Sequence, residues 1–278
     1  IADRASHFFE FRADYDDRHT GPRLGNALPL EFSVASYRYG HSMVRNSYDY
    51  NNTFGRPNGE APFDQIFAFT GDGGFFNLAD RIPKNWVIDW SRFLGIDPKD
   101  STDGRPARFA RKIDTLLAPP LGDMFSVAND LNGQPALADL QKLLKHLARR
   151  NLRRGYNLRL STGQALHKHL KDKGAVASGP VADVSTLPGM RPAISDFLKN
   201  SATGLHENTP LWFYVLAEAE AGGGNKLGEL GSFIVASTFI GVMLADPDSA
   251  LTKGFEPVHS PLRMPDNSPV DTLEKWMR

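Results

Sequence analysis

The chain has 278 residues, with 32 basic and 32 acidic side chains, so its formal net charge is zero. Hydrophobic residues make up 41% of it and include 18 Phe, which is enough for a sizeable core and excludes wholesale disorder. The zero net charge argues against a general nucleic-acid binder, which needs an excess of basic residues. Because the chain has no cysteine, disulfide scaffolds, thiolate metal sites, iron–sulfur clusters and cysteine nucleophiles are excluded.

The first predicted element is a helix over residues 28–45, LPLEFSVASYRYGHSMVR. Pro29 suits its first turn, Glu31 complements the helix dipole there, and Arg45 lies near the other end. Apolar and aromatic residues occur on nearly all sides of the segment, which is typical of a buried helix. His41 is therefore expected inside the protein.

Further helices are predicted along the chain, separated by long loops. The clearest amphipathic pattern covers 136–153, where Asn151 shares a stripe with leucines. Residues 161–174 begin with a capping box of Ser161 and Gln164. Because few segments alternate as strands do, the expected fold class is mainly α, with long loops and little β, in a single domain over residues 1–278. Other helices are expected at 86–95, 108–118, 209–224 and 230–245.

The longest apolar run is Leu230 to Ala245, and it contains Gly, Ser and Thr. A membrane-spanning helix needs about 20 predominantly apolar residues, more than this run supplies. We therefore predict a buried core helix here and no membrane span.

Two polar residues occupy positions where apolar ones are expected. Asn151 either ends its helix close to Gly155, or is buried and needs hydrogen-bond partners such as an imidazole N–H. Arg38 lies three residues before His41, and a buried guanidinium requires a counter-charge, which haem propionates would supply. A neutral imidazole in a dry helix is suited to bind a haem iron if a further group holds its other nitrogen.

Other motifs are interpreted without a catalytic role. His167 and His169 are two residues apart on a predicted helix, so they do not face each other, and the lysines around them indicate a solvated face. The arginines within 149–154 have the pattern of a solvated basic face. The glycine-rich segment 222–231 lacks both common phosphate-loop patterns, and the chain has neither G-x-S-x-G nor H-E-x-x-H.

The segment 31–45, EFSVASYRYGHSMVR, resembles the proximal helix of animal-type haem peroxidases, the peroxidase–cyclooxygenase superfamily. In that family an Arg-Tyr-Gly-His element contains the proximal histidine. The resemblance therefore implies that His41 is the ligand of a haem iron.

A second segment, RNLRRGYNLRLSTGQAL at 150–166, is similar to the bacterial form of the family's Asn-x-x-Arg-Gly element. The Asn of that element hydrogen-bonds the proximal imidazole, which is the role implied for Asn151. Arg38 and Arg154 match the family arginines that approach the haem propionates. The resemblance covers nearly the whole chain, because bacterial members are also similar over 82–93, 111–121 and 209–231.

The resemblance implies a myeloperoxidase-like helical fold and a haem-dependent peroxidase that uses hydrogen peroxide to oxidise small donors. The implied cofactor is haem b. A hydrogen bond between Asn151 and His41 would strengthen the imidazole as a ligand and leave the opposite face of the iron open for peroxide.

The chain departs from the family on the distal side. In the family the distal histidine, its catalytic arginine, the calcium site and any carboxylates esterified to the haem precede the proximal helix. Only 40 residues precede His41, and neither His7 nor His19 is followed by the Asp of the distal pattern. We therefore expect the proximal-side part of a haem peroxidase domain, with the distal side on a segment upstream of Ile1 or on a separate chain. Family members are often secreted, but no signal sequence is visible, so the compartment is left open.

Two alternatives remain. Fatty-acid dioxygenases of the cyclooxygenase type resemble Tyr-x-x-His, with a radical-forming tyrosine three residues before the ligand. Here Arg38 has that position, between Tyr37 and Tyr39, which favours the peroxidase branch. The other alternative is a haem-binding or interaction module that retains the scaffold without catalysis.

Overall fold

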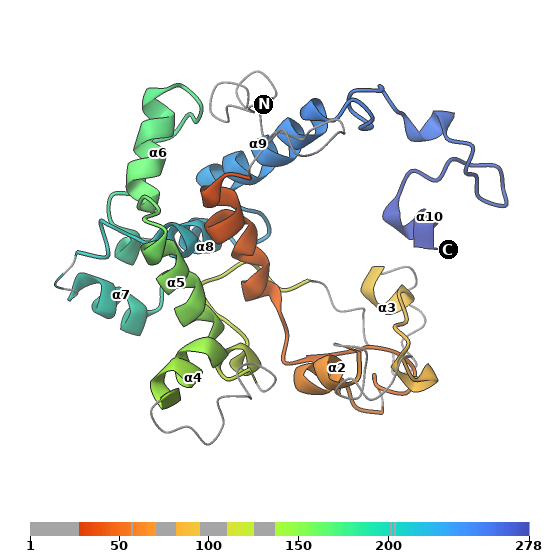
Figure 1. Cartoon of the computed structure of the whole chain (residues 1–278), viewed down its shortest axis with the longest axis horizontal. Helices are drawn as coiled ribbons and strands as arrows, with labels where there is room; N and C mark the ends of the chain where they lie inside the picture. Colours follow the sequence, from red (N-terminus) through yellow and green to blue (C-terminus); the bar gives the residue numbers. More distant parts are fainter. Residues whose placement is uncertain are drawn as a thin grey trace. The chain divides into compact units, whose positions relative to one another are not determined.

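A computed structural model of the chain describes residues 28–56, 58–70, 82–94, 110–124, 137–200, 202 and 204–277. Over these residues the fold is mainly helical with one pair of short strands, which confirms the predicted class (Figure 1). The chain divides into two compact units: unit 1 is Ile1–Met43, Lys112–Leu117 and Ala148–Phe255, and unit 2 is Val44–Arg111, Ala118–Leu147 and Glu256–Arg278. This division reflects packing within the chain, and the single domain stays a prediction.

Unit 1 is built around helix α8, in which Tyr214 and Val215 are completely buried. Helix α8 packs against η1, η2, α6 and α9. The apolar runs predicted to form core helices at 209–224 and 230–245 therefore correspond to α8 and α9. The elements of this unit are η1 (Glu31–Ala35), η2 (Ser36–Met43), α5 (Leu147–Asn157), α6 (Gly163–Asp172), η8 (Val184–Thr186), α7 (Pro192–Lys199), α8 (Leu211–Ala221) and α9 (Glu229–Ala245).

Helix α9 is buried on one side only. Leu230 and Ile234 belong to the core, whereas Phe239, Met243 and Leu244 are exposed. Among the described residues, no helix combines the length and the apolar character that a membrane crossing needs.

The segment predicted as a helix over 28–45 is helical over Glu31–Met43, but it is not an α-helix. Element η1 is a π-helical turn and η2 is a 3₁₀ helix. Three carbonyls along it accept hydrogen bonds from side chains. Nε of Arg38 donates to Ser33 O at 3.1 Å, Oγ of Ser42 donates to Tyr39 O at 2.9 Å, and Nε1 of Trp212 donates to Arg38 O at 3.2 Å. Side chains that bond to helix carbonyls in this way are a known cause of departure from α-helical geometry.

Burial along this segment is uneven. Phe32, Val34 and Ala35 belong to the apolar interior, whereas Tyr37 is exposed and His41 is half-buried. The prediction of a helix that is buried on nearly all sides is therefore met only in part. In η1 the apolar side chains are buried and Glu31 and Ser33 are half-buried, and in η2 the prediction is wrong. The reason is that the core elements α8 and α9 cover only part of the surface of η2.

The predicted helix over 136–153 is divided into α4 (Ala138–Lys145) and α5. His146 lies between them with an extended backbone, φ −97° and ψ 103°. Because the helix ends there, the leucine stripe is not a continuous buried face, and Leu140 is exposed. Asn151 remains buried on α5, with 2% of its surface exposed.

The N-cap of helix α6 lies one residue later in the chain than predicted. Thr162, not Ser161, is the N-cap residue, and its hydroxyl accepts a hydrogen bond from the Ala165 amide. Gln164 does not complete a capping box, because its side-chain amide bonds to the backbone N–H and the hydroxyl of Thr209. The helix ends before Gly174, as predicted, and that glycine has a φ of +70°.

The stretch predicted to be helical over 108–118 is irregular where the structure describes it, from residue 110. The Ile113 amide donates to Gly224 O at 2.8 Å, and both the amide and the hydroxyl of Thr115 donate to the carboxylate of Glu220. Backbone groups that bond to a distant segment cannot also form a helical ladder, which explains the error.

Unit 2 consists of short elements around a small aromatic core. Trp86 lies between Phe54 and Phe69, with ring centroids 4.2 and 4.8 Å away. Of the helix predicted at 86–95, the described residues form only α3. The elements are β1 (Ser47–Tyr48) and β2 (Ala61–Pro62), which pair antiparallel, then α2 (Phe63–Thr70), η4 (Lys84–Trp86), α3 (Ser91–Leu94), η5 (Pro119–Gly122), α4, η9 (Pro257–His259) and α10 (Leu273–Met277).

Two arginines of unit 2 meet one carboxylate, an arrangement we call the Asp49 cluster. Arg56 and Arg92 both form ion pairs with Asp49, and the three side chains are only 9–12% exposed. Burial by itself raises the pKa of Asp49. The hydrogen bonds from Arg56 and the charge of Arg92 outweigh that effect and hold the pKa below its ordinary value.

Candidate functional site

Asn151 connects the two segments that the sequence singles out. Its amide nitrogen lies 2.8 Å from Nδ1 of His41, and its amide oxygen accepts a hydrogen bond from Nη1 of Arg38 at 3.1 Å. Asn151 comes from α5, whereas Arg38 and His41 come from η2. The structure thus favours the buried, bonded Asn151 over a helix end, since α5 continues to Asn157.

The direction of the Asn151 amide follows from Arg38. A guanidinium only donates hydrogen bonds, so the amide oxygen must face Arg38 and the amide NH₂ must face His41. Nδ1 of His41 then accepts a hydrogen bond, and a neutral imidazole in this arrangement has its proton on Nε2.

The charges of two arginines act on His41, Arg38 from η2 and Arg150 from α5, and the charge of a third, Arg154 from α5, acts on Arg38. We call these three residues the arginine cluster of unit 1. The two on α5 are four residues apart and share a helix face. Burial lowers the pKa of Arg38, and the charges of Arg154 and Arg150 lower it further. Burial also lowers the pKa of His41, followed by the charges of Arg38 and Arg150.

This arginine cluster has no carboxylate partner among the described residues. Arg154 is exposed, as expected for the predicted solvated basic face, whereas Arg150 is half-buried and departs from that prediction. Uncompensated positive charge at a half-buried histidine favours the binding of an anion.

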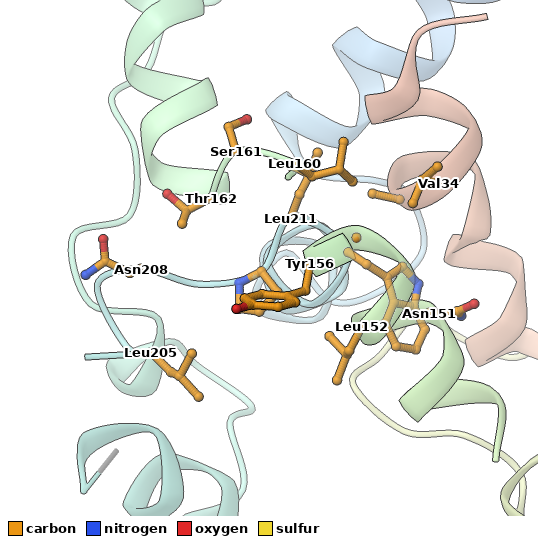
Figure 2. Close-up of a pocket in the computed structure, with 14 residues that line it drawn as sticks. Val34, Asn151, Leu152, Tyr156, Leu160, Ser161, Thr162, Leu205, Asn208 and Leu211 are labelled. Carbon is orange, nitrogen blue, oxygen red and sulfur yellow. The ribbon is translucent and has the colours of Figure 1, made fainter. Parts of the chain in front are cut away.

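A cavity of about 200 Å³ opens beside Asn151 within unit 1 (Figure 2). In this view the ring of Tyr156 lies in the middle of the wall residues, with Asn208 and Thr162 on one side and Asn151 on the other. Among the residues that the structure describes, no charged side chain lines it. The remaining walls are Val34, Ala35, Leu152, Gly155, Leu160, Ser161, Leu205, Pro210, Leu211 and Trp212.

His167 contradicts the prediction of a solvated face, because only 1% of its surface is exposed. Its Nδ1 lies 2.9 Å from the hydroxyl of Tyr214, and its Nε2 lies 3.6 Å from the carboxylate of Glu229. His167 shares one side of α6 with Gly163 and Leu170, four residues before it and three after it. That helical spacing was the signal in the sequence that could have identified it as buried.

The His167 contacts connect three helices of unit 1. Burial lowers the pKa of His167 more than Glu229 raises it, and burial raises the pKa of Tyr214 to about 12. His167 and Tyr214 therefore meet as neutral groups in the interior, beside the carboxylate of Glu229, whose pKa is lowered by a hydrogen bond from Ser178. His169 points to the surface, as predicted. Among the described residues, no group of three or more His, Cys, Asp or Glu is arranged to hold a metal ion.

Comparisons with protein-family models, with curated proteins and with solved structures find no match to this chain. The peroxidase resemblance therefore depends on the two motifs around His41 and Asn151. His7 and His19, considered for the distal side, lie outside the described residues.

Proposed function

We propose that the chain is the proximal-side part of a haem-dependent peroxidase, in which His41 binds the iron of haem b. The observation that carries this proposal is the hydrogen-bonded row of Arg38, Asn151 and His41. An imidazole with one nitrogen held is the ligand that a haem iron takes. The bound haem would supply the reaction with hydrogen peroxide and the oxidation of a small donor.

The charge of the site also fits this cofactor. Haem b has two propionate carboxylates, and the arginine cluster of unit 1 offers cationic side chains without carboxylate partners among the described residues. Arg38 and Arg154 would bind the propionates, as the resemblance implies. Guanidinium–carboxylate pairs are frequently bidentate, which would fix the orientation of the ring as well as its charge.

Ligation requires a rearrangement of the Asn151 amide. Nε2 of His41 must present its lone pair, so the proton must move to Nδ1, which then needs an acceptor. Turning the amide by half a turn supplies its oxygen to Nδ1. The amide NH₂ would then face the guanidinium of Arg38, donor against donor. Arg38 therefore has to release Asn151 when His41 becomes a ligand, and a propionate is the partner that would take its place.

The first experiment is the absorption spectrum of the chain mixed with ferric haem, beside His41→Ala and the control His169→Ala. Since His169 is exposed on α6, its replacement leaves the site intact. We expect a sharp Soret band for the wild type and for His169→Ala, and its loss in His41→Ala. The same band in all three would contradict ligation by His41, and no band in the wild type would contradict haem binding by this chain alone.

The role of Asn151 has its own measurement. Asn151→Ala should retain haem, but it removes the acceptor that makes the imidazole a stronger donor to iron. We expect the reduction potential of the haem to rise, because the ferric state loses stabilisation. An unchanged potential would remove Asn151 from this role.

A further inference from the structure

The cavity beside Asn151 has no part in the proposed haem chemistry. It lies among α5, the segment before α6 and the first turn of α8. Its volume is about 200 Å³. An engineered apolar cavity of about 150 Å³ in another protein holds benzene, so this one accommodates a single substituted aromatic ring.

The walls define the chemistry of an occupant. None of the described residues that line the cavity has a charged side chain, so a charged ligand would lose its hydration without a counter-charge from them. The rings of Tyr156 and Trp212 and several leucines provide apolar and aromatic surface. Aromatic pairs gain more than their buried area alone predicts, so a planar aromatic ring is favoured over a saturated one.

Asn208 and Thr162 lie on the side of the cavity opposite Asn151, and Ser161 precedes Thr162 in the chain (Figure 2). The hydroxyl of Ser161 has no hydrogen-bond partner among the described residues. Among the described residues, the side chain of Asn208 makes only a long contact, 3.4 Å from Nδ2 to Gly204 O, and its amide oxygen has no partner there. Small-molecule sites typically combine apolar walls with a few polar groups, and either of these two side chains can bond to a single hydroxyl.

We propose that this cavity is a binding site for a neutral phenol of one ring. The ring stacks against Tyr156, and the hydroxyl bonds to Ser161 or Asn208. Asn151 is both a wall of the cavity and the partner of His41. Occupancy therefore changes the surroundings of the amide that holds His41, although binding itself does not require haem.

The test is a calorimetric titration of the haem-free chain with p-cresol. We expect saturable binding of one molecule per chain, and a shift of the indole N–H resonance of Trp212 in a parallel NMR titration. Cyclohexanol, which has the hydroxyl without the aromatic ring, should bind more weakly, and benzoate should not displace p-cresol from the cavity. Absence of p-cresol binding at millimolar concentration would overturn the proposal.

Variants locate the binding. Tyr156 is 83% exposed, so Tyr156→Ala should fold normally and weaken p-cresol binding about threefold to tenfold. Phe197→Ala on α7 removes an aromatic ring that is 66% exposed and outside the cavity, and it should leave the affinity unchanged. Equal losses in the two variants would contradict the assignment.

A filling variant provides an independent measurement. A Cβ added to Gly155 would contact only Leu160, at 3.6 Å, which is an ordinary van der Waals distance. The Cβ of Gly155→Leu therefore fits, and the rest of the leucine side chain would fill part of the cavity that Gly155 lines. It should abolish p-cresol binding. Because His41→Ala should bind p-cresol like the wild type, failure of this proposal and failure of haem ligation can be told apart.

Discussion

The two units differ in whether their clustered arginines have a carboxylate partner. In unit 2, Arg56 and Arg92 share the carboxylate of Asp49, and all three charges are satisfied within the fold. In unit 1, the arginine cluster adjoins the neutral amide of Asn151, and the described residues include no carboxylate that pairs with it. In the Asp49 cluster the charges neutralise each other within unit 2. The arginine cluster of unit 1 keeps a net positive charge, which attracts an anion from solution.

The largest effect is expected from breaking the Asp49 cluster. Asp49→Asn keeps the shape but removes the carboxylate that two nearly buried guanidinium groups share, although Arg92 retains its ion pair with Asp89. The change should lower the free energy of unfolding by about 3 kcal/mol. Denaturant unfolding measures this. Asp139→Asn on α4 is the control, because its side chain is fully exposed, and it should change the stability little.

The same variant gives a pH dependence with a definite sign. The pKa of Asp49 is lower in the folded protein than in the unfolded chain. Its contribution to stability is therefore present above the unfolded pKa and is lost as the pH falls through the folded pKa. The difference between wild type and Asp49→Asn should shrink in acid, and a difference that is independent of pH would argue against an ionised Asp49.

A second variant would make unit 1 resemble unit 2. Asn151→Asp places a carboxylate between Arg38 and His41. In the wild type the pKa of His41 is lowered. In Asn151→Asp it should rise by about 1 or more, because an opposite charge at hydrogen-bond distance favours the imidazolium. An NMR titration of the His41 ring measures it. Haem affinity should fall in parallel, since the added charge opposes the propionates, and an unshifted His41 would mean that the carboxylate turns away.

The smallest expected effect is a difference between two arginines of α5, Arg150 and Arg153, in how far each lowers the pKa of His41. Arg150→Ala and Arg153→Ala each remove one positive charge from α5, but the charge of Arg150 acts on His41, whereas Arg153 is exposed and is not among the groups found to shift its pKa. Arg150→Ala should raise the pKa of His41, because one of the charges that lower it is removed, and Arg153→Ala should leave it nearly unchanged. Equal shifts would indicate a general field instead of a directed cluster.

Part of this arrangement could be predicted from the sequence. Helices α8 and α9 are long apolar runs, and burial determines their structure whatever surrounds them. Asn151 could be identified because a lone amide on an apolar stripe requires a partner. The helical form of 110–118 could not be excluded, since its partners Gly224 and Glu220 lie more than 100 residues away in the sequence.

Other features depend on three-dimensional contacts that local patterns do not record. No Gly or Pro marks the break between α4 and α5, so His146 offers no sign of it. In a segment with four arginines, periodicity does not show that Arg150 faces His41. His167 is different, because its helical spacing from Gly163 and Leu170 is present in the sequence and indicates a buried face. The neighbouring lysines led to the opposite prediction of a solvated face.

The 3₁₀ geometry of η2 has a consequence for the alignment of its side chains. In a 3₁₀ helix, residues three apart project along the same line, whereas in an α-helix they are turned by about 60° from each other. Arg38 and His41 are three apart, so a single amide group can reach both. The indole of Trp212, which binds the carbonyl of Arg38, contributes to holding this rotation. The angle between the imidazole of His41 and the guanidinium of Arg38 is thus determined by how the backbone is wound, and Trp212→Phe would disturb it without changing either side chain.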